Sequence, residues 1–100
     1  MTPPGVVGPL RLRLSDELYS LIRHLHPELK RKVRAGLEEI LRDPTVGKVL
    51  REELNGLRSF RVGRLRIIYR LAAQSVEVVA VGPRRRIYAD TWRLVKREDR

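Results

Sequence analysis

The segment that most constrains the fold is FRVGRLRIIYRL, residues 60–71, because apolar and polar side chains alternate along it on both sides of a glycine. Alternation at every second residue is typical of a β-strand with one buried face. Gly63-Arg64 suits a two-residue turn of type II′, which favours glycine at its first central position. The segment therefore predicts a β-hairpin with strands at Arg58–Val62 and Leu65–Leu71.

The turn also fixes the register of the hairpin, and the register sorts the side chains into two faces. Arg61 lies directly opposite Arg66, and both share a face with Arg70. Like charges opposite each other destabilise a strand pair by a few tenths of a kcal/mol up to about 1 kcal/mol. Such a face is either a solvated surface whose arginines extend into water, or a basic groove that binds phosphate with the planar fork of arginine. The other face is apolar and can pack on helices: Phe60, Val62, Leu65, Ile67, Tyr69 and Leu71.

Basic residues are concentrated around this hairpin. The chain has 22 Lys and Arg against 12 Asp and Glu, a net charge of +10, which favours a polyanion or an acidic protein as partner. Residues 56–88 hold eight arginines and one acid, Glu77, so that third contributes 8 − 1 = +7. Its last arginines, Arg84, Arg85 and Arg86, could converge on the same groove, where the phenol of Tyr88 could transfer protons. The plainer alternative is a solvated turn and a tyrosine that only packs.

The rest of the chain predicts one α+β domain. Ser15 is a favourable N-cap for a first helix, which Pro27 ends, and Pro44 ends a second helix that starts near Glu28. The order β-α-α-β-β-β implies a helical hairpin on one face of a twisted antiparallel sheet. Residues 1–100 form this single domain, and residues 1–8 are a loose lead-in. The remaining elements are expected at Leu10–Leu14 (strand), Val76–Val81 (strand) and Ala89–Lys96 (short helix).

Other chemistries find little support in the sequence. His24 and His26 are two residues apart on a helix and do not share a face. The chain has no cysteine, no phosphate-cradling glycine loop and no Ser/His/Asp constellation. No apolar run approaches the roughly 20 residues of a membrane span, and the first residues lack the pattern of a signal peptide. We therefore expect no metal, no cofactor, no membrane and a cytoplasmic location.

The stretch LNGLRSFRVGRLRIIYRL, followed by VEVVAVGPRRRIY, resembles the RelE/ParE superfamily of toxins from bacterial and archaeal toxin–antitoxin pairs. The family pattern is a leucine-glycine connection, an Arg-Val-Gly hairpin, a strand with arginine, two apolar residues and tyrosine, and a closing Gly-x-Arg with a later tyrosine. DPTVGKVL, ahead of this stretch, also fits. The resemblance covers about residues 10–95 and implies a helical hairpin packed on a twisted antiparallel sheet.

The resemblance also implies an activity. RelE members enter the ribosomal A site and cut mRNA by attack of a 2′-hydroxyl on the adjacent phosphate. It further implies a small acidic, RelB-like antitoxin as partner, besides ribosome-bound mRNA and ribosomal RNA. Matched position by position, it gives catalytic roles to Arg61, Arg66, Arg84 and Tyr88. We expect contacts with RNA from the remaining arginines of the basic region, Arg64, Arg70, Arg85 and Arg86.

Two departures from the RelE pattern keep other activities open. A second family lysine falls at Gly63, with Arg64 the nearest substitute, and Pro83 occupies the place of an acid–base histidine found in some members. ParE members keep the fold, lack the nuclease residues and inhibit DNA gyrase. The sequence is thus compatible with a RelE-type ribonuclease, a ParE-like gyrase inhibitor, or a catalytically degenerate RNA-binding relative.

Overall fold

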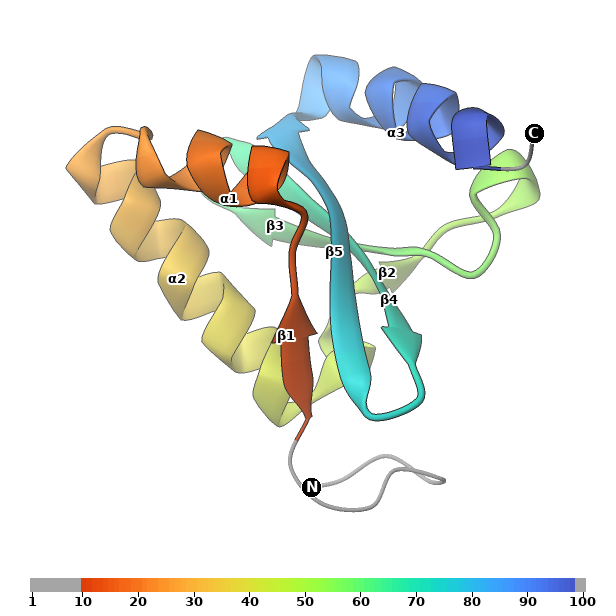
Figure 1. Ribbon diagram of the computed structural model, residues 1–100, viewed down its shortest axis with the longest axis horizontal. Helices are drawn as coiled ribbons and strands as arrows, with labels where there is room; N and C mark the ends of the chain where they lie inside the picture. Colours follow the sequence, from red (N-terminus) through yellow and green to blue (C-terminus); the bar gives the residue numbers. More distant parts are fainter. Residues whose placement is uncertain (1–9, 99–100) are drawn as a thin grey trace.

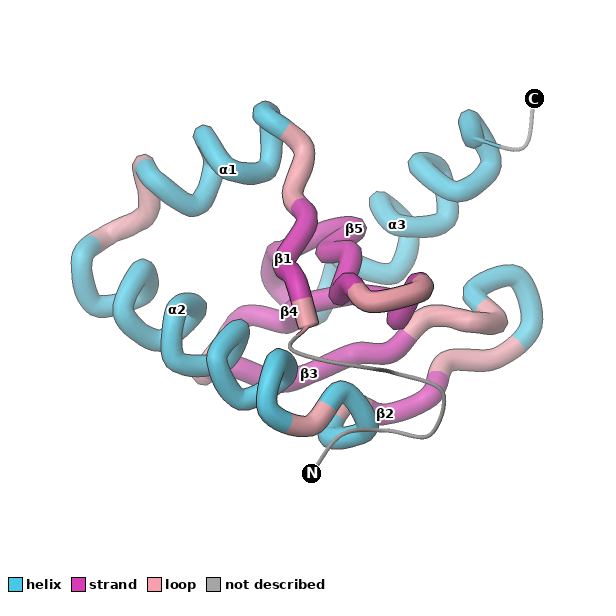
Figure 2. The backbone as a smooth tube through the Cα atoms, turned by 60° about the horizontal axis from the view of Figure 1, so that its bottom comes forward, coloured by secondary structure: helices cyan, strands magenta, loops and turns pink. Residues whose placement is uncertain are grey.

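The computed structural model describes residues 10–98, in which a five-stranded sheet lies between two helical layers (Figures 1 and 2). The strand order is β1-β5-β4-β3-β2. The predicted lead-in, residues 1–8, lies outside the described residues. The elements in chain order are β1 (Arg11–Arg13), α1 (Asp16–Arg23), α2 (Pro27–Arg42), η1 (Pro44–Val46), β2 (Lys48–Val49), η2 (Glu52–Leu54), β3 (Arg58–Val62), β4 (Leu65–Ala72), β5 (Ser75–Pro83) and α3 (Arg84–Glu98).

Local capping defines the helical hairpin α1–α2. The Ser15 hydroxyl accepts a hydrogen bond from the N–H of Leu18 at 3.1 Å, as expected of an N-cap. Pro27 opens α2 at its first position, where a missing N–H costs nothing, and so separates the two helices. Helix α2 ends at Arg42, just before Pro44, as predicted.

The structure confirms the hairpin of β3 and β4. Val62 pairs with Leu65 and Arg61 with Arg66, so the chain turns at Gly63-Arg64. Gly63 has φ +60, which glycine adopts without steric cost at the first position of such a turn. Five of the six predicted apolar side chains pack against the helical hairpin, whereas Leu71 remains 40% exposed near the end of β4.

The main core lies between the sheet and the helices α1 and α2. A Cβ added to Gly36 of α2 would lie 2.7 Å from Val62 Cγ2. Glycine at this position therefore lets α2 approach β3 more closely than a residue with a side chain would. As a result, the hairpin packs tightly against α2. The buried apolar residues of this core are Leu18, Val33, Leu37, Ile40, Val62, Ile67, Tyr69, Val76, Val78 and Val81.

The buried tyrosine of β4 ties the connection after α2 to the sheet. Tyr69 is 0% exposed, and its hydroxyl donates to the carbonyl of Pro44 at 2.6 Å and accepts from the N–H of Gly47 at 2.9 Å. Arg58 Nη1 donates to the carbonyl of Gly47 at 2.9 Å. The segment DPTVG thus serves as an anchoring point between α2 and β2.

Helix α3 differs from the prediction in length and position. It begins at Arg84 rather than Ala89 and packs on β4, β5 and η2, on the face opposite α1 and α2 (Figure 2). The reason is a stripe at helical spacing that faces the sheet: Ile87 and Val95 pack in a second core, and between them the buried Thr91 donates its hydroxyl to the carbonyl of Ile87. The sheet therefore has helices on both faces, not on one. The buried residues of the second core are Leu57, Ile68, Ala80 and Ile87.

The sheet is also mixed rather than wholly antiparallel, because β1 pairs with β5 in parallel, with Arg11 opposite Ser75. A parallel pair needs a long crossover, which the helices and hairpins between these strands supply. A further two-residue strand, β2, extends the other edge. No helix within residues 10–98 is long and apolar enough to cross a membrane.

Candidate functional site

The opposed arginines of the hairpin lie on the face of the sheet that carries α3. Arg61 and Arg66 are direct partners in the β3–β4 register, so their side chains share a face. Arg61 is exposed, and its Nε donates to the carbonyl of Gly63 at 3.4 Å. Arg66 is half-buried. The structure therefore places two cations side by side at the end of the sheet where β3 turns into β4.

Arg66 is joined to Tyr88 through a serine. Its Nη1 donates to the hydroxyl of Ser59 at 3.4 Å, and the same hydroxyl lies 3.4 Å from the phenol oxygen of Tyr88. Ser59 comes from β3 and Tyr88 from the second turn of α3, so three elements meet at one hydroxyl. Tyr88 is half-buried against the second core. The predicted residues Arg61, Arg66 and Tyr88 are thereby brought together.

The three consecutive arginines form the first turn of α3 and are all exposed. Gly82, two residues before Arg84, pairs with Arg66, so the helix starts beside the same end of the sheet. No acidic residue accompanies them in that turn. Cations at a helix N-terminus oppose the positive end of the helix dipole. Together with Arg61 and Arg66 they make an end of the molecule that is strongly favourable to anions.

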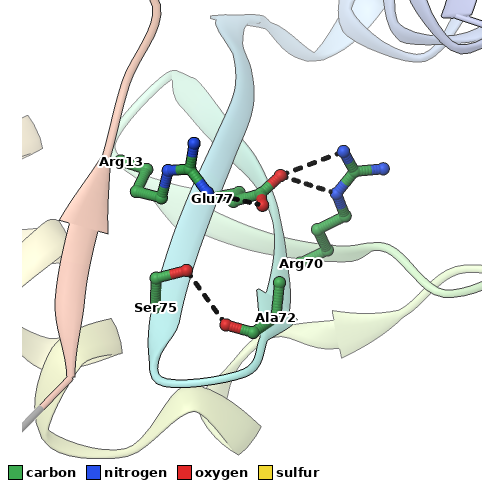
Figure 3. A network of polar contacts seen from close by, with 5 residues as sticks. All are labelled: Arg13, Arg70, Ala72, Ser75 and Glu77. Carbon is green, nitrogen blue, oxygen red and sulfur yellow. Dashed lines mark hydrogen bonds and ion pairs between the residues drawn. The ribbon is translucent and has the colours of Figure 1, made fainter.

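Arg70 has different surroundings from the other predicted residues. Its Nε and Nη2 donate to Glu77 Oε2 at 3.0 and 2.9 Å, and Arg13 of β1 approaches Glu77 Oε1 at 3.6 Å (Figure 3). The sole acid between residues 56 and 88 thus joins three neighbouring strands. Arg64, by contrast, is exposed at the hairpin turn.

One groove in the described part of the chain does not include Arg61, Arg66 or Tyr88. It has a volume of about 650 Å³ and runs between α1, β5 and α3, over an apolar floor that includes Leu18, Val79 and Ile87. Arg70 and Glu77 line it. A second groove, of about 330 Å³, lies between β1, α1 and α2. The predicted basic face is therefore divided, because α3 crosses it.

Sequence reasoning missed Ser59, although the alternation carried the signal. In RSFRV, Ser59 is two residues from Arg61 and must share its face, and only one side of that strand is apolar. It also missed how far α3 extends, since the charged RRR concealed the stripe that begins at Ile87.

This arrangement has a definite chemical capacity. Two guanidinium groups can stabilise the negative charge that develops on a phosphate, and a phenol and a hydroxyl can hold or exchange a proton. Among residues 10–98, no three His, Cys, Asp or Glu side chains gather in a way that could hold a metal ion.

The chain has known relatives in sequence and in fold. Residues 10–88 match the family model described as ParE toxin of type II toxin–antitoxin system, parDE. No curated protein sequence is significantly similar to the chain. The toxin–antitoxin complex RelBE2 from Mycobacterium tuberculosis includes a chain of 30% identity, with 77% of this chain and 100% of that one covered and a TM-score of 0.67.

Two more distant structures are similar in fold. A free-state mutant of the E. coli toxin RelE has 14% identity and a TM-score of 0.71, with 91% of this chain and 98% of that one covered. The archaeal RelE–RelB complex from Pyrococcus horikoshii OT3 has 18% identity and a TM-score of 0.63, with 77% and 97% covered.

Proposed function

The chain belongs to the RelE/ParE superfamily of toxins from toxin–antitoxin systems, and on that premise we propose that it is a RelE-type toxin, a ribosome-dependent mRNA endoribonuclease that inhibits translation in the cytoplasm. The observation that supports this activity most directly is the linked set of Arg66, Ser59 and Tyr88 beside Arg61. It combines phosphate-binding cations with a proton-transfer group.

The proposed reaction is an attack of the mRNA 2′-hydroxyl oxygen on the adjacent phosphorus. A bond forms between that oxygen and phosphorus, and the bond from phosphorus to the 5′-oxygen breaks. We assign proton transfer to the phenol of Tyr88, which donates its proton to the 5′-oxygen as that oxygen leaves. The proton lost from the 2′-hydroxyl passes through solvent water to the phenolate and restores the phenol. Arg61, Arg66 and Arg84 stabilise the charge that builds on the phosphate oxygens, where fixed cations are most effective. Arg64, Arg70, Arg85 and Arg86 are assigned contacts with RNA.

The ribosome has a physical role in this proposal. Arginines and one tyrosine do not include a strong general base, so the ribosome must align the mRNA for the reaction. Alignment of the reacting groups can lower the activation free energy by several kcal/mol, and by up to about 7–11 kcal/mol in well-oriented systems. We therefore expect cleavage of translated mRNA and little cleavage of naked RNA.

The first experiment compares induced wild-type protein with Arg66→Ala and Tyr88→Phe. Primer extension on a translated message should show cuts with wild type and a loss of about 10²-fold or more with each variant, since each removes charge stabilisation or proton transfer at the reacting phosphate. Arg31→Ala and Tyr19→Phe are matched controls, because both side chains are exposed and lie on the helical hairpin. Unchanged cleavage in both site variants would contradict the assignment of these residues.

A second candidate is inhibition of DNA gyrase, which the match to a ParE family model favours. Gly63 and Pro83 stand where RelE members have basic or acid–base residues, and this also fits a toxin without nuclease activity. A gyrase supercoiling assay run beside primer extension separates the two. Inhibited supercoiling with intact mRNA would replace the RelE proposal, and neither effect would indicate a catalytically degenerate RNA-binding relative.

We also propose an acidic, RelB-like antitoxin as the partner that neutralises this +10 chain. Its support is that the RelBE2 and the archaeal structures are toxin–antitoxin complexes. Disordered acidic segments that fold on binding can wrap a large surface. Purification from the native host should yield the toxin with a small acidic companion.

A further inference from the structure

Ser59 is a polar side chain in a place where the fold alone would favour an apolar one. It lies in β3, between the central strand β4 and the short edge strand β2, is 2% exposed and pairs across the ladder with the buried Ile68. Burial of a hydroxyl is unfavourable unless it is hydrogen-bonded. Its partners in this structure are Arg66 and Tyr88, the two residues to which the proposed reaction gives charge stabilisation and proton transfer.

We propose that Ser59 is a positioning residue, which holds the guanidinium of Arg66 and the phenol of Tyr88 in a fixed relation through its one hydroxyl. This inference rests on the proposed function, and it names a residue that neither the motif resemblance nor the sequence pattern assigned. Ser59 itself does not touch the substrate: it acts through its two neighbours.

The donor and acceptor inventory fixes the direction of the bond from Arg66, whereas either hydroxyl can donate between Ser59 and Tyr88; we infer the order in which Ser59 donates. A guanidinium only donates, so Arg66 Nη1 donates to Ser59 Oγ and the serine oxygen accepts. The serine hydrogen is then available to the phenol oxygen of Tyr88. In this arrangement the hydrogen of Tyr88 points away from Ser59 and is free for a substrate oxygen. The positive guanidinium polarises both hydrogen bonds in the same direction.

The two distances, 3.4 Å each, are long for such bonds. Catalytic hydrogen bonds are often long in a free enzyme and shorten when substrate is bound. A phosphate that draws Arg66 and Tyr88 together would shorten both contacts at once, with Ser59 as the common point. The serine thereby links the strand hairpin to α3, the two elements that supply the site.

The test compares Ser59→Ala with Ser75→Ala in purified protein. Ser75 is a matched control, because it is also a buried strand serine, but its hydroxyl donates to the carbonyl of Ala72 across the turn between β4 and β5 (Figure 3). Single-turnover cleavage on programmed ribosomes should be slower by about 10- to 100-fold in Ser59→Ala, as expected for a misplaced group. The half-saturating ribosome concentration should not change, and Ser75→Ala should cleave like wild type.

A second measurement does not depend on cleavage. With ¹³C-labelled tyrosine rings, the NMR signal of Tyr88 in the free protein should move in Ser59→Ala and in Arg66→Ala, but not in Ser75→Ala. Ser59→Thr, which keeps the hydroxyl, should restore the Tyr88 signal and most of the cleavage rate. The double variant Ser59→Ala, Tyr88→Phe should cleave only slightly more slowly than Tyr88→Phe alone, since the serine acts through that phenol.

The outcomes separate the two proposals. If wild type does not cleave ribosome-bound mRNA, the proposed function is wrong, while the NMR result still decides whether Ser59 positions Tyr88. If wild type cleaves and Ser59→Ala cleaves equally well, or if the Tyr88 signal does not move, the positioning role is wrong. It is wrong as well if Ser59→Ala and Ser75→Ala slow cleavage to the same extent, because the effect is then one of stability.

Discussion

At the scale of single residues, Tyr69 is a structural side chain of the hairpin, whereas its neighbour Arg66 is assigned to the proposed site. It points to the face opposite Arg66 and is enclosed by α2 and the connection after it. Its hydroxyl satisfies one backbone carbonyl and one backbone N–H that would otherwise be buried without partners. In the family strand pattern of arginine, two apolar residues and tyrosine, the arginine and the tyrosine thus lie on opposite faces of the sheet.

Tyr69→Phe should lower the free energy of unfolding by about 1–3 kcal/mol, because it leaves the carbonyl of Pro44 and the N–H of Gly47 without their partner. Urea denaturation at neutral pH measures the loss. Tyr19→Phe is the control, since Tyr19 is 60% exposed, and it should leave stability nearly unchanged. A Tyr69→Phe variant as stable as wild type would show that these two hydrogen bonds contribute little.

The same pair of proteins should respond differently to alkaline pH. Burial raises the pKa of Tyr69 above its ordinary value of 10.0, although the hydrogen bond from Gly47 opposes the change. The native state then holds the phenol proton at pH values where the unfolded chain has released it. This stabilisation is complete below about pH 10 and is lost as pH rises from there through the folded pKa. The stability gap between wild type and Tyr69→Phe should therefore narrow above about pH 10, as urea titrations on both sides of it would show.

At the scale of elements, α3 packs firmly on the sheet although the charges in its first turn are unfavourable for a helix. Ile87 and Thr91 are buried against the sheet, whereas Arg84, Arg85 and Arg86 crowd its first turn. A helix selected only for stability would carry Asp or Glu there. The arginines are understandable if this turn faces a polyanion, as the proposed function requires.

Arg85→Glu should therefore raise stability, by about 0.3–1 kcal/mol at low salt, because it places an anion at the positive end of the helix dipole. The same change should weaken cleavage on the ribosome. Arg93→Glu is the matched control within the helix: it removes an ion pair with Asp90 and should lower stability slightly. Thermal unfolding at low and high salt measures both, and a loss of stability in Arg85→Glu would contradict the account of this turn.

How far the sequence predicts an element depends on whether its interactions are local. The turn at Gly63-Arg64, the Ser15 cap and the proline ends of the helices are local, and the structure confirms them. The partner of β1 is decided by contacts far along the chain, which alternation cannot reveal. The position of α3 depends on which sheet face still has apolar side chains uncovered. Arg66 and Tyr88 were predicted to share a site, but the hydroxyl that joins them was not, because a lone serine carries no chemical signature.

At the scale of the whole molecule, the net charge of +10 should control how fast the protein meets its partners. For the proposed partners, an acidic antitoxin and a ribosome, we expect long-range attraction to accelerate association, and salt screens this attraction over about 10 Å at 0.1 M. We expect the association rate constant for either partner to fall steeply with added salt, while dissociation changes less. Stopped-flow mixing over a salt series provides the measurement. An association rate that salt does not change would mean that apolar contacts, not charge, guide the encounter.

The parallel pairing of β1 with β5 has a consequence for the order of folding. Arg11 must find Ser75, a separation of 75 − 11 = 64 residues, whereas β3, β4 and β5 are joined by tight turns. Closing a long loop costs more entropy than closing a short one, and contacts far apart in sequence slow folding. The three-stranded meander should thus assemble first, with the edge strand β1 added late, and opening of the folded sheet should begin at that edge. Hydrogen exchange should then be faster at Leu12 than at Ile67.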